Sequence, residues 1–226
     1  MGAFPQGRDI EDAELFVGLS RDDLRAVWSK SLRRIVPPGS FLYHQGEPAE
    51  TMFLIETGRV RLHELTDDGR EVLVTFIYPG EVFGAVIAGA VYRATTQADT
   101  PVRAYAWTAT IMKEFMVRFP RLQRNLFELT KRYMYFARDR YRLLATASVE
   151  RRIGWALAYL GEKIGRLQQG STVIAGRTVQ RDLADLASAT IFTVNRVLSD
   201  WERRGALTKR RGRIVLLRPL RQIDFL

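Results

Sequence analysis

Residues 178–205 constrain this chain most, because their pattern predicts two short helices joined by a tight turn. Within the second helix, apolar residues recur with helical spacing at Val194, Val197, Leu198 and Trp201. Thr190 has a side chain suited to cap that helix. The opposite face is largely polar, so it is not expected to be buried. This pattern is typical of a helix-turn-helix, whose second helix enters the major groove of double-stranded DNA.

Four residues near the start of the second helix are candidates for reading base edges: Ile191, Phe192, Asn195 and Arg196. An arginine can donate two hydrogen bonds to guanine, and an outward apolar side chain suits the thymine methyl group. Ile191 also borders the apolar stripe of the helix, so packing inside the protein is an equal alternative for it.

The segment 207–217 has two short strand-like runs around a basic turn, which predicts a hairpin. Next to a helix-turn-helix such a hairpin would form a wing. Its cations would then lie near DNA phosphates: Lys209, Arg210, Arg211 and Arg213. The alternative is a helical hairpin and a solvated basic turn that bind no nucleic acid.

Charge is distributed unevenly along the chain. Residues 1–111 carry 11 Lys and Arg against 15 Asp and Glu, a net charge of −4. Residues 112–147 carry 9 against 3, and residues 148–226 carry 15 against 7, giving +6 and +8. An acidic front and a basic back predict two domains, of which only the second meets a polyanion.

The 226-residue chain contains no cysteine, which excludes disulfides, cysteine-bound zinc and cysteine-held iron–sulfur clusters. It has no uninterrupted apolar stretch of membrane-spanning length, and its first residues lack the apolar core of a signal peptide. We therefore expect no membrane partner and a cytoplasmic location. No nucleophile–base pair, metal-spaced cluster or phosphate-binding loop is visible, so we expect no enzymatic activity.

The front half predicts a short helix over about residues 20–30, followed by many short strands. Glycines separate these strands, and apolar and polar residues alternate within them. This spacing favours a small antiparallel barrel or sandwich. The expected strands include 51–56, 60–65, 72–78, 93–98 and 102–106.

A long helix is predicted from Pro120 to Ala147, since proline suits the first helical position and no breaker follows. One apolar track, interrupted by Arg140, would cover the β-domain. A second track beside it would face a partner helix in a homodimer: Phe127, Thr130, Met134, Ala137, Tyr141 and Leu144. The alternative is one helix buried in the core of a monomer. A dimer would match a palindromic operator.

In this order the parts resemble the CRP/FNR superfamily of bacterial transcription regulators. The resemblance covers nearly the whole chain from about residue 15. It rests on Pro38-Gly39, residues 45–60, 68–71, 79–84 and 193–198. It implies an α+β chain with an antiparallel, cyclic-nucleotide-binding-like β-roll (1–110), a hinge and dimerisation helix (111–147) and a winged helix-turn-helix (148–226). It also implies a sensor for a signal, a promoter as target, and RNA polymerase as a partner there.

The sequence departs from the cyclic-nucleotide binders of this superfamily. Their phosphate cassette reads Phe-Gly-Glu and, after some eight or nine residues, Arg-(Ser/Ala)-Ala. In those proteins the glutamate binds the ribose hydroxyl. Here Gly84 is followed by Ala85, whose methyl side chain cannot form that hydrogen bond. Either Tyr92 or Arg93, the latter in an Arg-Ala-Thr run that ends at Thr95, takes the arginine position. Ala137 and Arg138 stand where the long helix would face the base. Losing such hydrogen bonds costs kilocalories, so cyclic AMP is not the expected effector.

Haem would need an axial ligand, and the histidines are His44 and His63; His63 is better explained as a surface or satisfied core residue. The options that remain are an unidentified small acid, a pocket filled by its own side chains, and control by abundance alone. An anion would be sought at Arg93, Tyr92 and Arg138.

At the DNA end the resemblance is also partial. The family's cyclic-AMP receptor reads bases with several residues, and this chain retains only Arg196 of them. We therefore expect a half-site that differs from the half-site of that receptor. Four residues match family positions that hold phosphates: Gln180, Arg181, Thr190 and Thr193. The alternative function is a cyclic-nucleotide- or small-ligand-binding module that regulates another protein. The basic wing and the complete helix-turn-helix favour the DNA-binding regulator.

Overall fold

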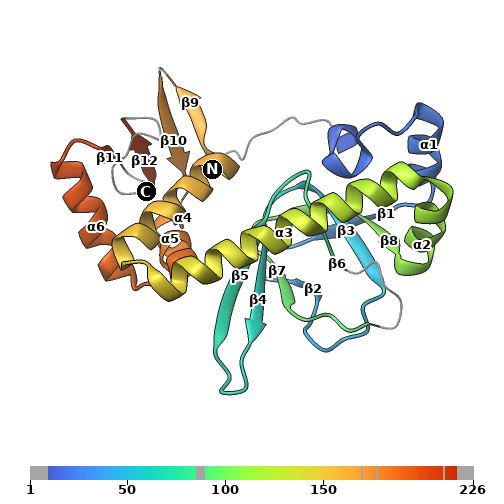
Figure 1. Ribbon diagram of the computed structural model, residues 1–226, viewed down its shortest axis with the longest axis horizontal. Coiled ribbons are helices and arrows are strands. Elements are labelled where there is room, and N and C mark those ends of the chain that lie inside the picture. Colours follow the sequence, from blue (N-terminus) through green and yellow to red (C-terminus); the bar gives the residue numbers. More distant parts are fainter. Residues whose placement is uncertain (1–9, 85–89, 169, 177, 211, 218–226) are drawn as a thin grey trace. The chain divides into compact units, whose positions relative to one another are not determined.

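The structure is a computed structural model that describes residues 10–84, 90–168, 170–176, 178–210 and 212–217. These residues form two compact units, with the division falling inside the long helix between Tyr135 and Phe136 (Figure 1). The domain boundaries expected from sequence, after residues 110 and 147, stay predictions.

The first unit contains two four-stranded antiparallel sheets, with strand orders β1-β8-β3-β6 and β2-β7-β4-β5. Their strands are β1 (Leu32–Val36), β2 (Phe41–Tyr43), β3 (Thr51–Thr57), β4 (Val60–Leu65), β5 (Glu71–Ile77), β6 (Val82–Gly84), β7 (Thr95–Ala98) and β8 (Val102–Thr108). The expected antiparallel β-domain is confirmed. The strands β1, β2 and β6 were not among those assigned to particular residues from the sequence.

The first unit also contains short helices: η1 (Ile10–Asp12), η2 (Glu14–Phe16), α1 (Arg21–Ser29) and α2 (Ala109–Arg118). The predicted helix at residues 20–30 is confirmed as α1. Ser20 accepts a hydrogen bond from the Asp23 amide, and the Asp23 carboxylate accepts one from the Ser20 amide. This reciprocal capping box fixes the start of the helix.

The long helix α3 (Pro120–Thr146) confirms the predicted helix almost to the residue. In the first unit its apolar side buries Leu122 and Leu126 in a core that includes Phe16, Leu54 and Trp107. Asn125 adds two hydrogen bonds of 2.9 Å to the Leu15 and Val17 carbonyls. The predicted cover of the β-domain by one track of this helix is therefore confirmed.

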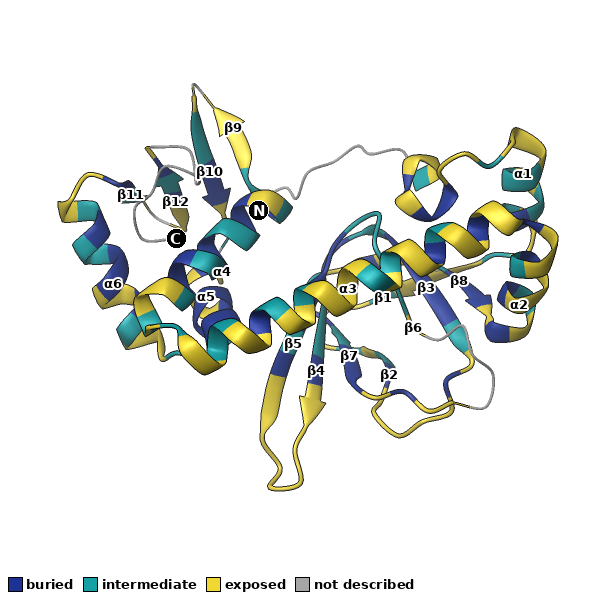
Figure 2. Cartoon of the chain, viewed as in Figure 1, coloured by how far each residue is buried: buried dark blue, intermediate teal, exposed yellow. Residues whose placement is uncertain are grey.

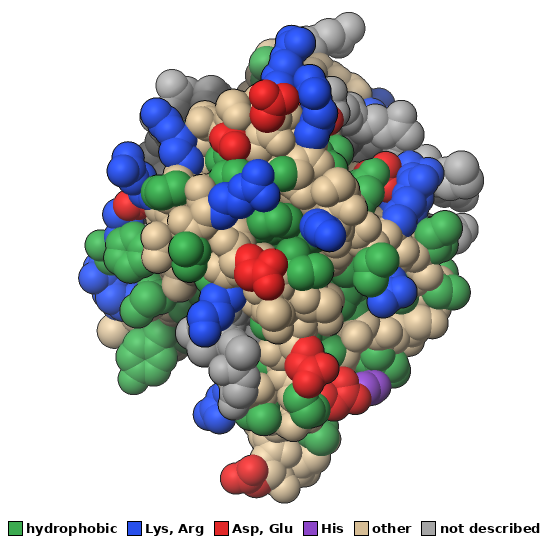
Figure 3. Space-filling model, turned by 90° about the vertical axis from the view of Figure 1, so that its right-hand side faces the viewer, with side chains coloured by type: hydrophobic (Ala, Val, Ile, Leu, Met, Phe, Trp, Pro, Cys, Tyr) green, Lys and Arg blue, Asp and Glu red, His purple; other side chains and the backbone are tan. Residues whose placement is uncertain are grey.

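Viewed from the side of α1 and α2, the surface mixes basic, acidic and apolar side chains (Figure 3). Such a mixture differs from the one-signed surface that attracts a polyanion. It agrees with the net charge of −4 over residues 1–111, which hold 11 basic and 15 acidic residues.

The second unit contains the end of α3 and a compact set of elements: α4 (Val149–Ile164), β9 (Arg166–Gln168), β10 (Ser171–Ala175), α5 (Val179–Ala187), α6 (Ile191–Arg203), β11 (Leu207–Arg210) and β12 (Arg213–Leu216). Its sheet has the order β11-β12-β10-β9. The predicted helix pair and wing are confirmed as α5–α6 and β11–β12. The helix α4 and the strands β9 and β10 were not expected. Within the described residues, no helix has the length and apolar content needed to cross a membrane.

Candidate DNA-binding surface and ligand pocket

The helix α6 is capped and half-buried in the way its sequence predicts. Thr190 accepts a hydrogen bond of 3.1 Å from the Thr193 amide, which satisfies one free N–H group of the first turn. One face of the helix is buried in the core of the unit: Val194, Val197, Leu198 and Trp201. Burial of this face fixes which side chains the other face presents.

The four predicted base-reading residues all lie on the exposed side of α6. Phe192 is 79% exposed and Ile191 48% exposed, and Asn195 and Arg196 are exposed as well. Exposing a phenylalanine ring this far costs apolar burial that folding alone would favour. Ile191 is half covered, so the structure leaves both of its alternatives open.

Two of the four predicted phosphate-binding residues near α5 and α6 have free surface, and the other two share a hydrogen bond. Gln180 and Arg181 are exposed on the first turn of α5. The hydroxyl groups of Thr190 and Thr193 lie 2.9 Å apart. Their roles toward phosphate stay predictions.

In the wing, Lys209 contacts two residues of α6. Its ammonium group lies 2.6 Å from the Ser199 hydroxyl and 3.5 Å from Glu202, and its amide donates to Glu202 at 2.7 Å. The side chain therefore ties the wing to α6, and its role toward phosphate stays a prediction. Arg210 and Arg213 are exposed beside the hairpin turn. Arg211 lies outside the described residues.

The turn between α5 and α6 contains a strained residue, Ser188, with φ 48° and ψ 54°. This left-handed conformation is costly for residues with a Cβ atom, and glycine adopts it freely.

We expect Ser188→Val to lower the free energy of unfolding by about 1–2 kcal/mol, because a β-branched side chain is disfavoured in this conformation. Ser188→Gly should be at least as stable as the parent. Urea unfolding of the three proteins measures both effects. Equal stability of the valine and glycine variants would contradict the assigned backbone conformation.

The predicted dimer face of α3 is largely exposed (Figure 2). Phe127 is 67%, Met134 65% and Tyr141 75% exposed, Thr130 and Ala137 are exposed, and Leu144 is partly covered. An apolar stripe with helical spacing that one chain leaves uncovered is expected to meet another helix.

The predicted ligand pocket of the β-roll contains a stack of aromatic rings. The rings of Tyr43 and Tyr92 lie 3.6 Å apart and 8° from parallel, and those of Phe53 and Phe83 lie 5.2 Å apart. The Tyr92 hydroxyl donates to the Thr51 carbonyl at 2.9 Å and accepts from the Thr51 amide at 3.0 Å. Burial raises the pKa of both tyrosine hydroxyls, so they stay protonated at neutral pH.

The other residues predicted for an effector have different surroundings. Arg93 is exposed, whereas Thr95 is buried and accepts a hydrogen bond of 3.0 Å from the Gln45 amide. Gly84 is exposed, with φ 98°. Ala85 lies outside the described residues. Ala137 and Arg138 are exposed in the second unit.

An open groove of about 570 Å³ lies within the second unit, between the end of α3 and α4. Its lining includes Arg142, Arg151 and Trp155, and it contains none of the residues predicted for an effector. It is therefore a different feature from the predicted pocket.

His63 is 4% exposed on β4, and its Nε2 lies 3.9 Å from the Glu71 carboxylate. Burial lowers its pKa, while Glu71 raises it and Arg61 and His44 lower it further. Among the described residues its Nδ1 has no hydrogen-bond partner. A buried neutral histidine fits this environment, and no group of residues that could hold a metal ion is found in the described parts of the chain.

Because His63 binds its proton less readily in the folded state, acid is expected to favour unfolding. The stability of the protein should fall as the pH drops below about 6.5, where the unfolded chain takes up the proton. We expect His63→Leu to reduce the loss of melting temperature between about pH 7.5 and 5.5. An identical loss in both proteins would show that His63 does not carry this dependence.

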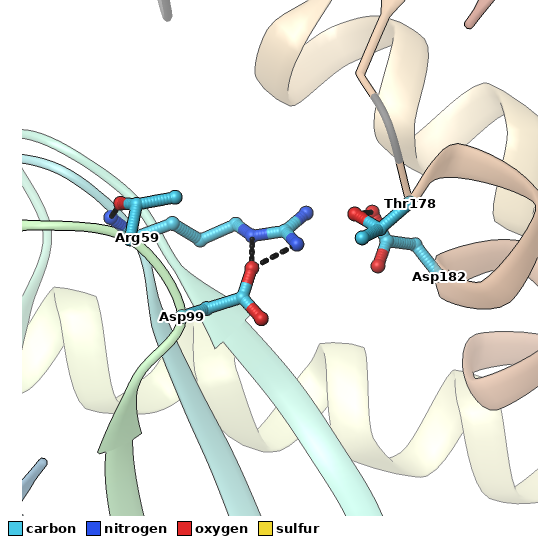
Figure 4. A network of polar contacts seen from close by, with 5 residues as sticks. Arg59, Asp99, Thr178 and Asp182 are labelled. Carbon is cyan, nitrogen blue, oxygen red and sulfur yellow. Dashed lines mark hydrogen bonds and ion pairs between the residues drawn. The ribbon is translucent and has the colours of Figure 1, made fainter. Parts of the chain in front are cut away.

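A buried charge in the β-roll, Arg59, could not be found from the sequence. Arg59 is 3% exposed, and its Nε donates to Asp99 at 2.6 Å (Figure 4). Its guanidinium also lies 4.3 Å from the centre of the Phe76 ring. The Thr178 hydroxyl in the other unit donates to Asp182 at 3.1 Å, also drawn in Figure 4. The Arg59–Asp99 pair joins residues that are 40 positions apart in the chain, so it has no local sequence signal.

Two family models match the chain over these same regions. The cyclic nucleotide-binding domain matches residues 33–119, and the Crp-like helix-turn-helix domain matches residues 151–221. Together they cover the β-roll and the helix-turn-helix with its wing. The chain belongs to the CRP/FNR superfamily. It is a DNA-binding transcription regulator of that type.

Relatives of this CRP/FNR chain are similar over almost their full length. The nitrogen fixation regulation protein FixK of Bradyrhizobium diazoefficiens is 28% identical, covering 97% of this chain and 92% of the relative. The CRP-like cAMP-activated global transcriptional regulator of Mycobacterium tuberculosis is 26% identical, covering 91% and 92%. Both relatives are regulators by name, and the Mycobacterium tuberculosis relative is named as a transcriptional regulator.

The solved structure of FixK2 from Bradyrhizobium japonicum has a TM-score of 0.74 at 24% identity, covering 85% of this chain and 94% of that one. A CooA mutant of Carboxydothermus hydrogenoformans has a TM-score of 0.73 at 18% identity, covering 87% and 88%. These likenesses show the CRP/FNR fold.

Proposed function

We propose that this CRP/FNR regulator acts as a homodimer on a palindromic operator, with one α6 helix in each of two successive major grooves. The observation that carries the proposal is the exposed apolar and basic start of α6, with Phe192 79% exposed, on a helix whose other face is buried. The uncovered stripe of α3 would join the two chains. DNA as the target would place the protein in the cytoplasm, where RNA polymerase is the partner expected at a promoter.

The reading roles follow from side-chain chemistry. Arg196 would donate two hydrogen bonds to a guanine, Asn195 would pair with an adenine, and Phe192 would contact a thymine methyl group. Gln180, Arg181 and the wing arginines would bind phosphates, which position the protein without selecting sequence. We expect a half-site different from that of the family's cyclic-AMP receptor.

The DNA proposal is tested by the salt dependence of duplex binding. For a dimer that contacts six to ten phosphates, affinity should fall about 10³- to 10⁵-fold between about 50 and 200 mM salt. Fluorescence anisotropy with a labelled duplex measures this. An affinity that does not change with salt would contradict phosphate binding and favour the alternative in which the chain regulates another protein.

For the effector, we propose that cyclic AMP does not control this protein. The stacked Tyr43 and Tyr92 rings, and the Tyr92 hydroxyl bonded to Thr51, occupy part of the region where the sequence lacks the cassette residues. Removing hydrogen-bonding groups from a site built for a polar ligand weakens binding strongly. Control by abundance, or by a small acid at Arg93, would then replace the nucleotide.

We expect about 1 mM cyclic AMP to leave the melting temperature unchanged, since a ligand stabilises only the state that binds it. Differential scanning fluorimetry measures the shift, with ATP at the same concentration as the control. A rise of several degrees with cyclic AMP alone would contradict this proposal.

A further inference from the structure

The second half of α3 is part of the DNA-binding unit and carries part of the proposed dimer face. The Phe136 ring packs against Trp155 and Tyr159 of α4, with ring centres 5.6 Å and 5.2 Å apart. On another face of the same segment lie Ala137 and Tyr141, both exposed. This segment therefore contacts the body of the unit on one side and is free on the other.

Arg140 lies between these two faces and is unlike its neighbours. It is 8% exposed, whereas the side chains of Arg138 and Arg142 are 71% and 76% exposed. It interrupts an otherwise apolar track of α3, a break that dimerisation does not explain. A buried arginine is retained at a cost unless its charge is matched by polar partners.

The Arg140 Nη2 group donates to the Leu186 carbonyl of α5 at 3.4 Å. Leu186 is in the last turn of α5, which ends at Ala187, and carbonyls there lack partners inside the helix. A cation at this end also interacts favourably with the helix dipole. Leu186, which accepts this hydrogen bond, lies two residues before the left-handed Ser188. The helix α6 begins three residues after Ser188.

We propose that Arg140 is a positioning residue that fixes the direction of the reading helix relative to the dimer helix. The proposal rests on the proposed dimer function. Its consequence is specific: Arg140 sets how far apart and at what angle two reading helices stand, so it controls the spacing between half-sites that the dimer accepts. It contributes nothing to the recognition of one half-site.

The test uses full-length Arg140→Met, which keeps the length of the side chain and removes its charge and donors. Arg142→Met is the matched control, since it makes the same change on the same helix at an exposed position. Affinities are measured for a duplex with the preferred spacing, for duplexes with one base pair added or removed, and for a single half-site. Melting temperatures are recorded for all variants.

We expect the parent and Arg142→Met to discriminate between spacings, and Arg140→Met to lose about tenfold of that discrimination. The affinity of Arg140→Met for one half-site should equal that of Arg142→Met. Equal discrimination by the two variants overturns the proposal. A parent protein that does not discriminate between spacings overturns the dimer function together with this proposal.

If Arg140→Met does not fold, Arg140→Lys decides. Lysine keeps a cation but has a shorter reach and no planar fork. Reduced spacing discrimination at a melting temperature within a few degrees of the parent supports positioning. Unchanged discrimination by the lysine variant overturns it, because Arg140 would then serve stability alone.

Discussion

Replacing Arg196 by alanine is expected to reduce the preference of the protein for its operator over random DNA by about 10- to 100-fold. Arg196 is the exposed cation nearest the start of α6, and a bidentate contact to guanine contributes about 1–3 kcal/mol of discrimination. The affinity for random DNA should change little, because phosphate contacts dominate it. Competition binding with operator and random duplexes measures the ratio.

Arg203→Ala is the matched control for this experiment. Arg203 is also exposed on α6, but it lies in the last turn and is paired with Asp200 at 3.0 Å. The Arg203→Ala variant removes the same charge from the same helix, so both variants lose the same general electrostatic attraction to DNA. If both variants lose the same discrimination, Arg196 does not read a base.

Replacing Met134 by glutamate is expected to convert the dimer to a monomer and to weaken operator binding by at least about 100-fold. Met134 is 65% exposed at the middle of the apolar stripe of α3, and a two-fold dimer would place a charge opposite its own copy. A monomer also loses the gain that comes from linking two half-site contacts. Sedimentation analysis and binding to the operator measure both effects.

Tyr135→Glu provides the control for the dimer experiment. Tyr135 is 50% exposed on the same helix, one position away and therefore about 100° around the axis from Met134. The change in charge and hydrophobicity is similar, but the residue is outside the stripe. Loss of the dimer in both variants, or in neither, would contradict the assignment of the stripe as the interface.

The helices and the wing could be predicted because their signals are local. The apolar spacing of α6, its Thr190 cap and the length of α3 depend on neighbouring residues alone. The helix α4 has a similar local signal, because Ile153, Leu157 and Leu160 are buried at helical spacing. The strand β1 is mostly exposed, so its residues do not alternate.

Partners of single side chains could not be predicted in the same way. The Tyr92 hydroxyl meets Thr51 across 41 residues, and Arg140 meets Leu186 across 46. The sequence predicted a phosphate contact for Lys209 and gave no sign of its contacts with Ser199 and Glu202. Composition gives the charge of a segment, whereas tertiary structure decides which of those charges remain free. The sequence showed that Arg140 interrupts the apolar track, but it did not show the Leu186 carbonyl that Arg140 contacts.

Selection of bound duplexes from a random pool with the full-length protein tests most directly whether a dimer reads a palindromic operator. We expect an inverted repeat whose two half-sites are centred about one helical turn apart, or about 10 base pairs. Each half-site should contain a guanine whose replacement abolishes the difference between the parent and Arg196→Ala. A single unrepeated site, or a pool without an enriched sequence, would contradict the dimeric reading of a palindromic operator.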